Sequence, residues 1–148
     1  MTVEQTIAKL RQLKHDLPVL VGNEMKNFAL DNMRAEAWEG KPWPRRKKGA
    51  KRDAGRRLLI DTGDGERSVR VVRISSDTIE LTANEYMIAH NAGVNKTVSV
   101  KAHRRKGHRV KGHSRKMNLP QRQFAGRSAT LSGRIEKVWE MRVKKVFT

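Results

Sequence analysis

Apolar residues near the beginning of the chain recur at spacings of three and four positions, which is the pattern of an amphipathic helix. This stripe consists of Val3, Ile7, Leu10, Leu13 and Leu17. Thr2 and Gln5 have the spacing of a capping box, in which each side chain bonds a free backbone N–H group at the helix start. Proline is tolerated only in the first turn of a helix. The sequence therefore predicts one helix that ends before Pro18 and a second helix from Pro18 to about Trp38.

A polar segment follows from position 39 to position 57, and it includes the stretch KPWPRRKKGAKRDAGRR with a single acidic residue, Asp53. Its prolines and glycines predict a loop, and its cations make it the first of two long basic loops. Trp38 and Trp43 lie at the start of this segment. Isolated tryptophans usually pack, so we expect both side chains to pin the loop to the core.

Two short segments, RSVRVVRIS and DTIELTA, alternate between apolar and polar positions, which is the period of a half-buried strand. The residues Ser75, Ser76 and Asp77 at their junction favour a turn, so we expect an antiparallel hairpin. The segment KTVSVKA further along is a third strand candidate. Between the hairpin and this strand, residues 84–93 predict a short helical turn that ends at Gly93.

The C-terminal segment again has the helical period. Its apolar stripe consists of Leu131, Ile135, Val138, Met141 or Arg142, and Val146. Either Ser128 or Thr130 has the hydroxyl needed to cap this helix. The order helix, helix, loop, strands, helix predicts an α+β fold in a single domain over residues 1–148. In this fold the N-terminal helices and the C-terminal helix pack on a small antiparallel β-sheet.

Charge changes this picture, because the chain is strongly basic. Its 148 residues include 33 Lys and Arg against 15 Asp and Glu, for a net charge of +18 at pH 7. So many like charges repel one another in a compact monomer, and we expect a polyanion or an acidic protein surface as partner. The chain has no cysteine, which excludes disulfides and thiol chemistry. It also lacks the apolar run of a signal peptide or membrane helix, so we expect a soluble intracellular protein.

The second basic loop, residues 101–117, is the densest cationic stretch, and no acidic residue occurs between Tyr86 and Ile135. Its candidate contacts with DNA or an acidic partner are Lys101, Arg104, Arg105, Lys106, Arg109, Lys111, Arg115 and Lys116. We expect this loop to project from the core, since so many like charges cannot be buried without partners. Residues 95–116 contain no aromatic side chain for stacking on bases. A nucleic-acid contact here would therefore involve the backbone, without sequence preference.

Metal chemistry and catalysis find little support. His103, His108 and His113 have a spacing found among zinc ligands, but no Cys or carboxylate is near and the surrounding cations would repel a dication. We expect solvated histidines, no metal and no cofactor.

Asp61 and His90 could serve as a general acid or base. No nucleophile elbow, phosphate-binding loop or metalloprotease motif accompanies them, and DTGDG is typical of a turn, so we do not expect an enzyme.

Four segments occur in order along the chain: WEGKPWP, LLIDTGDGERSV, YMIAHNAG and NLPQRQFAGRS. Together they resemble the phage virion morphogenesis family, the small tail-completion proteins of tailed phages, including Mu-like ones. The matching positions are Trp43, Pro44, Leu59, Ile60, Asp61, Thr62, Gly63, Tyr86, His90, Gly93, Pro120, Arg122, Phe124, Gly126 and Ser128. The resemblance spans about residues 38–147. The chain departs from the family pattern at Asp64-Gly65-Glu66, where a leucine is usual, and at Met87, where a small residue is usual.

The resemblance implies a virion structural protein in the neck or at the head-proximal end of the tail, acting in tail completion or head–tail joining after assembly in the host cytoplasm. It implies a homo-oligomer, a hexameric ring, with neighbouring neck and tail proteins as partners and no membrane contact. Packaged DNA or an acidic neighbouring subunit would meet the second basic loop. Composition alone indicates only a basic α+β domain, so the alternative is a sequence-independent nucleic-acid-binding protein.

Candidate subunit-interface or structural positions are Trp43, Asp61, Gly63, Tyr86, His90, Pro120, Arg122 and Phe124. Pro120 fixes φ in an extended chain, after which Arg122 and Phe124 alternate as in a strand or edge segment. Tyr86 and His90 are four positions apart, so they would lie on one face of a short helix. We expect His90 to be buried and hydrogen-bonded.

Overall fold

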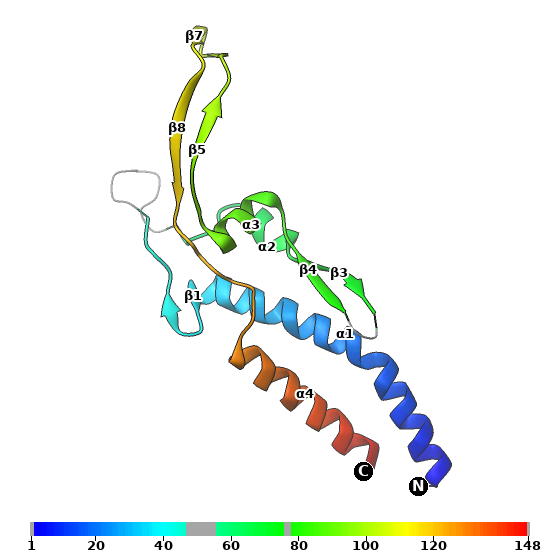
Figure 1. The fold of residues 1–148 in the computed structure, drawn as a ribbon. Coiled ribbons are helices and arrows are strands. Elements are labelled where there is room, and N and C mark those ends of the chain that lie inside the picture. Colours follow the sequence, from blue (N-terminus) through cyan, green and yellow to red (C-terminus); the bar gives the residue numbers. More distant parts are fainter. Residues whose placement is uncertain (1, 47–55, 76–77, 148) are drawn as a thin grey trace.

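The computed structural model describes residues 2–46, 56–75 and 78–147 (Figure 1). In chain order the elements are α1 (Val3–Ala35), β1 (Ala37–Trp38), β2 (Lys41–Pro42), α2 (Asp64–Ser68), β3 (Arg70–Ile74), β4 (Ile79–Thr82), α3 (Glu85–Ala92), β5 (Val94–Val100), β6 (His103–Arg105), β7 (His108–Val110), β8 (His113–Leu119) and α4 (Ala129–Phe147). Residues 47–55 of the first basic loop, and positions 76 and 77 of the expected hairpin turn, lie outside the described residues.

The N-terminal segment is one helix, α1, so the predicted division into two helices at Pro18 is wrong. The predicted capping box is confirmed, because Thr2 accepts from the N–H of Gln5 while the Gln5 side chain accepts from the N–H of Thr2. Leu13 and Gly22, on either side of Pro18, are both buried. This packing outweighs the cost of a proline inside a helix, about 3 kcal/mol. The helix bends in its N-terminal half (Figure 1), as prolines commonly cause.

Helix α1 ends at Ala35, earlier than predicted, because Glu36 adopts the left-handed conformation (φ 52°) and its N–H closes on the last turn. Trp38 then pairs with Lys41 in the short β1–β2 hairpin. The turn residues Glu39 and Gly40 both have positive φ, 46° and 79°, as a tight two-residue hairpin turn requires. The start of the first basic loop is therefore ordered into a hairpin.

The α+β prediction is confirmed, and the antiparallel strands of the described residues form four separate two-stranded sheets. Strands β3 and β4 make the predicted hairpin, with a bulge between Val71 and Arg73. Strand β5 overlaps the third strand candidate at residues 96–100, and α3 ends at Gly93 as predicted. Strand β5 pairs with β8, beyond β6 and β7, so the second basic loop is a hairpin extension.

One hydrophobic core gathers where α1, the chain around Trp43, the segments on either side of α2, α3 and the segment before α4 meet. Its buried members are Ala29, Met33, Trp43, Leu58, Leu59, Val69, Met87 and Phe124. Trp43 pins its segment to the core, as predicted. Trp38 is half-buried and meets the ring of Phe28 edge to face, with centroids 5.7 Å apart. Within the described ranges no helix is both long and apolar enough to cross a bilayer.

Helix α4 packs along α1, and Figure 1 shows the two helices side by side. Ser128 caps it, because the Ser128 hydroxyl accepts from the N–H of Leu131. The predicted stripe is half-buried at Leu131, Ile135 and Val138 and buried at Val146. Position 141 does not belong to it, since Met141 is 58% exposed.

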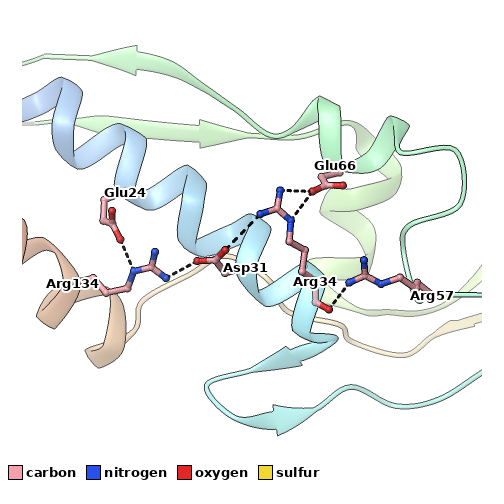
Figure 2. A network of polar contacts seen from close by, with 6 residues as sticks. All are labelled: Glu24, Asp31, Arg34, Arg57, Glu66 and Arg134. Carbon is pink, nitrogen blue, oxygen red and sulfur yellow. Dashed lines mark hydrogen bonds and ion pairs between the residues drawn. The ribbon is translucent and has the colours of Figure 1, made fainter.

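A chain of charged side chains links α4, α1 and α2 (Figure 2). Its members are Glu24, Asp31, Arg34, Arg57, Glu66 and Arg134. Arg134 on α4 donates to both Glu24 and Asp31 on α1, and its guanidinium also lies 5.6 Å from the centre of the Phe28 ring. Arg34 continues the chain from Asp31 to Glu66 on α2. This network fixes α4 and α2 relative to α1.

Candidate functional site

The second basic loop forms a two-stranded arm, residues 94–119, that projects from the rest of the molecule (Figure 1). We call it the basic arm. At its base, β5 and β8 pair from Val94 with Leu119 to Val100 with His113. At its tip, β6 and β7 pair around a turn at Lys106 and Gly107, where φ is 49° and 82°. The arm packs only marginally on other elements. The predicted projection of this segment is confirmed.

Between base and tip the ladder is interrupted for two residues on each strand, Lys101-Ala102 and Lys111-Gly112. A short sequence repeat, VKAH and VKGH, brackets the interruption, and the two copies run antiparallel to each other. In each copy the histidine Nδ1 lies close to the carbonyl oxygen of the lysine, at 3.0 Å for His103 and 3.1 Å for His113. The ring thus satisfies a carbonyl that the interrupted ladder leaves without a cross-strand partner.

The tip places two arginines directly opposite each other, since Arg104 pairs with Arg109 across β6 and β7. Opposed residues in an antiparallel pair share one face of the ribbon. A concave site of about 360 Å³ lies there, lined by Ala102, His103 and both arginines. The two exposed arginines therefore border a hollow.

All the predicted contact residues of the arm are solvent-exposed. They are Lys101, Arg104, Arg105, Lys106, Arg109, Lys111, Arg115 and Lys116. Over residues 2–46, 56–75 and 78–147, each ion pair that involves a carboxylate lies outside the arm. The described part of the chain also contains no group of His, Cys, Asp or Glu that could hold a metal ion. The arm is a cationic surface without internal counter-charges.

The two faces of the arm's base differ in character. Side chains alternate between the faces of a ribbon. One face carries the half-buried Val94, Val98, Val100, Met117 and Leu119. The other face carries the exposed Asn95, Thr97, Ser99, Ser114, Lys116 and Asn118. An isolated two-stranded ribbon is marginally stable in water.

Residues of three of the four sequence motifs converge at the foot of the arm, in what we call the motif junction: Trp43, Pro44, His90, Asn91, Arg122, Phe124 and Ala125. Arg122 is 6% exposed, and its Nε and Nη2 donate to the carbonyl of Pro44 at 3.2 and 3.1 Å. Its backbone N–H donates to the carbonyl of His90 at 2.8 Å. Trp43 Nε1 donates to the carbonyl of Gln123 at 2.8 Å. Three of the four sequence segments are thus tied together here.

Residues 120–127 do not form a strand, although the alternation of Arg122 and Phe124 suggested one. Their backbone groups have other partners. The N–H groups of Phe124 and Ala125 both donate to the side-chain oxygen of Asn91, at 2.8 and 3.0 Å. Asn32 of α1 donates to the carbonyl of Phe124 at 3.2 Å. Pro120, half-buried, begins this irregular segment directly after β8.

Sequence reasoning missed Asn91 and Asn32, the two amides that hold this segment. Asn91 lies inside the motif YMIAHNAG, but its partners are more than 30 positions away along the chain. Asn32 lies within the apolar stripe of a helix. A buried asparagine on a helix commonly bonds a backbone group of another segment, and this is the signal that was available.

His90 is buried as predicted, at 3% exposed, and its ring meets Tyr86 edge to face with centroids 4.4 Å apart. Its hydrogen bonding is weaker than expected. Nδ1 lies 3.4 Å from Nη1 of Arg122, and Nε2 is buried without a partner among the described residues. Burial, with help from the Arg122 and Arg46 charges, lowers the pKa of His90 to about 4. The ring is therefore neutral near pH 7, beside a guanidinium whose pKa burial also lowers.

Asp61 and Gly63 lie apart from the junction, in the turn that leads into α2. Asp61 pairs with Arg56 at 3.0 Å, and Gly63 has a φ of 81°. They border a shallow polar cavity of about 450 Å³ that Tyr86 also lines. The predicted turn is confirmed.

No protein-family model, curated protein or solved structure matches this chain.

Proposed function

We propose that this protein is a structural component of a tailed-bacteriophage virion that acts in tail completion or head–tail joining. The proposal rests on the four sequence segments that resemble the phage virion morphogenesis family. Its working form would be a hexameric ring in the neck or at the head-proximal end of the tail. Neighbouring neck and tail proteins would be its partners, and packaged DNA would pass its inner wall.

One observation carries the proposal furthest: Arg122, from the last segment, bonds the carbonyl of Pro44 from the first segment and meets His90 from the third. Residues that define the resemblance therefore serve to hold the chain together. A scaffold built in this way suits a protein whose role is assembly, and it supports the view that the protein is not an enzyme.

The basic arm supports the oligomeric part of the proposal. It extends away from the core, carries no acidic residue and has a half-buried apolar strip at its base. A ribbon of this kind is marginal on its own, and a net charge of +18 disfavours a free monomer. A neighbouring subunit and a polyanion together would satisfy both needs.

The test is a reconstruction of purified particles from a phage that carries this chain. We expect density for a closed ring of copies on the tail axis, between head and tail tube. A single copy per particle, or a position away from that axis, would overturn the proposal. The free protein is expected to be smaller than the ring, because the ring forms on its template, so particles are the decisive sample.

A sequence-independent nucleic-acid-binding protein is the second candidate, favoured by the unpaired cations of the arm. Two measurements separate the candidates. A protein of this second kind binds DNA of any sequence with strong salt dependence and is absent from purified particles. A ring component co-purifies with particles in a fixed stoichiometry, whatever its affinity for free DNA.

A further inference from the structure

We infer that the tip of the basic arm is a clamp for the phosphate backbone of duplex DNA, centred on Arg104 and Arg109. This deepens the proposed function, on which it rests, by naming the residues and the form of nucleic acid for the contact with packaged DNA. The ribbon lies in a groove of the duplex. The guanidinium groups of Arg104, on β6, and Arg109, on β7, bind the same DNA phosphate from its two sides.

The arrangement of the two arginines indicates that an anion binds between them. Arg104 and Arg109 are directly opposed and exposed, and neither side chain bonds another group among the described residues. Like charges opposed across a ribbon repel, and an oxyanion between them turns that repulsion into attraction. The hollow of about 360 Å³ that they border with His103 is where such an anion would sit. Planar guanidinium groups bind phosphate oxygens through paired N–H donors.

Cations on both faces of the arm favour a groove over a flat protein surface. In the β5–β8 ladder, Arg115 pairs with Val98 and Lys116 with Thr97, so neighbouring cations point to opposite faces. A flat acidic protein would contact one face and leave the other unpaired. The major groove of B-DNA admits a two-stranded ribbon and presents phosphates along both walls.

The absence of aromatic side chains favours duplex over single-stranded nucleic acid. Residues 94–119 contain no Phe, Trp or Tyr. Proteins that bind single strands combine a basic groove with aromatic side chains on which the bases stack. The arm supplies the basic component alone, which suits a duplex whose bases are already stacked.

The experiment measures binding of the full-length protein to a labelled mixed-sequence duplex, its separated strand and poly-glutamate, over a range of salt concentrations. The variant is Arg104→Gln with Arg109→Gln. Each lost phosphate contact lowers the slope of log affinity against log salt by about 0.9, so the double variant should lose about 1.8 from the slope. The same change in slope corresponds to about a 200-fold loss of duplex affinity at about 50 mM salt.

Two matched variants control for charge and fold. Lys9→Gln with Lys14→Gln removes the same charge from exposed positions on α1 and should leave the slope unchanged. Arg104→Lys with Arg109→Lys keeps the charge and should retain the slope. It should weaken binding, because a lysine ammonium lacks the planar pair of N–H donors with which a guanidinium binds two phosphate oxygens. Circular dichroism checks the fold, which the Gln variant should keep since it relieves a like-charge pair.

Three results would overturn the inference: a wild-type slope in the Arg104→Gln, Arg109→Gln protein, equal affinity for duplex and single strand, or equal affinity for duplex and poly-glutamate. The last would show that the arm does not distinguish a phosphate backbone from an acidic polypeptide. Each is distinguishable from failure of the proposed function. Suppose that the protein is absent from particles but that the Arg104→Gln, Arg109→Gln variant still shows a lower slope of log affinity against log salt. These results would overturn the virion role and leave the DNA clamp supported.

Discussion

At the scale of single residues, burial of His90 makes the stability of the protein depend on pH. Its pKa is about 4 in the folded chain against an ordinary value of 6.5. Between these values the unfolded chain takes up a proton that the folded chain does not. The free energy of unfolding should therefore be constant for this group above about pH 6.5 and fall as pH drops towards 4, by up to about 3 kcal/mol.

Urea unfolding at a series of pH values checks this expectation, with His90→Gln as the variant that cannot titrate. The variant should lose most of the stability change between pH 4 and 6.5. His15→Gln, at a side chain that is 84% exposed, is the matched control and should keep it. If His90→Gln retains the full pH dependence, another group is responsible.

Gly93 is required by its backbone conformation and by its neighbour. Its φ of 71° and ψ of 154° lie in a region essentially restricted to glycine. A Cβ there would also lie 3.1 Å from the backbone nitrogen of Gln121. We expect Gly93→Ala to lower the free energy of unfolding by about 3 kcal/mol.

Gly40→Ala is the control, because Gly40 also has a positive φ, 79°, but open space where a Cβ would point. It should cost only about 1 kcal/mol, for the left-handed conformation alone. Equal costs at both positions, measured by urea unfolding, would mean that neither the backbone conformation of Gly93 nor its contact with Gln121 adds to the cost.

At the scale of elements, Arg134 is the main polar link between α4 and α1. It donates to Glu24 and Asp31 and lies over Phe28. Arg134→Ala should lower the free energy of unfolding by about 2 kcal/mol, since two charged hydrogen bonds and a ring contact are lost. Lys137→Ala, at an exposed position on the same helix, should change it by less than about 0.5 kcal/mol.

A double-mutant cycle with Glu24→Gln separates the link from the helix itself. We expect a coupling energy of about 1 kcal/mol between the two positions. A coupling near zero would show that Arg134 acts through packing on Phe28, and not through its carboxylate partners.

Local pattern predicted the elements well and their partners poorly. The helical conformation of the N-terminal segment, the capping box at Thr2 and the hairpin of β3 and β4 all depend on neighbours in sequence, and the structure confirms them. The predicted apolar stripe is not buried as a whole, because Val3, Ile7 and Leu10 are exposed. The continuity of α1 through Pro18 depends on packing from distant segments, which overrides a local penalty. The pairing of β5 with β8 could not be predicted from β5 alone, because β8 (His113–Leu119) is polar over most of its length and has apolar side chains only at Met117 and Leu119.

In the candidate site, too, some features could be predicted from the sequence and others depend on contacts between distant segments. Charge predicted the projection of the basic arm, since unpaired cations exclude burial whatever the fold. The opposition of Arg104 and Arg109 depends on the turn at Lys106 and Gly107, which fixes the register. The role of Asn91 depends on three-dimensional contacts with Phe124 and Ala125 that no local pattern encodes.

At the scale of the whole molecule, the arm and the core are separable. The arm packs only marginally on other elements, so its tip contributes little to the core. Replacing residues 101–112 by Asn-Gly would join Val100 to His113 through a two-residue turn that suits their pairing. The melting temperature should change by no more than about 3 °C, whereas binding to duplex DNA and incorporation into particles should be lost.

Calorimetry and particle complementation check the two halves of this prediction. A control with Asn-Gly in place of Lys106-Gly107 keeps the arm's length and removes one charge, so it should retain both properties. A large fall in melting temperature on removing the tip would mean that the arm supports the core. Normal particles without the tip would mean that assembly does not use it.

The pairing of α1 with α4 has a consequence for synthesis in the cell. Glu24 and Arg134, which join these helices, are 110 positions apart along the chain. At about 5–20 residues per second, the ribosome delivers α4 roughly 5–20 seconds after that part of α1. The β3–β4 hairpin arrives earlier and also packs on α1, so it covers part of the helix first. The face of α1 that α4 covers in the folded protein stays exposed longest during synthesis. It is where a nascent chain of this protein would most readily bind a chaperone or a wrong partner.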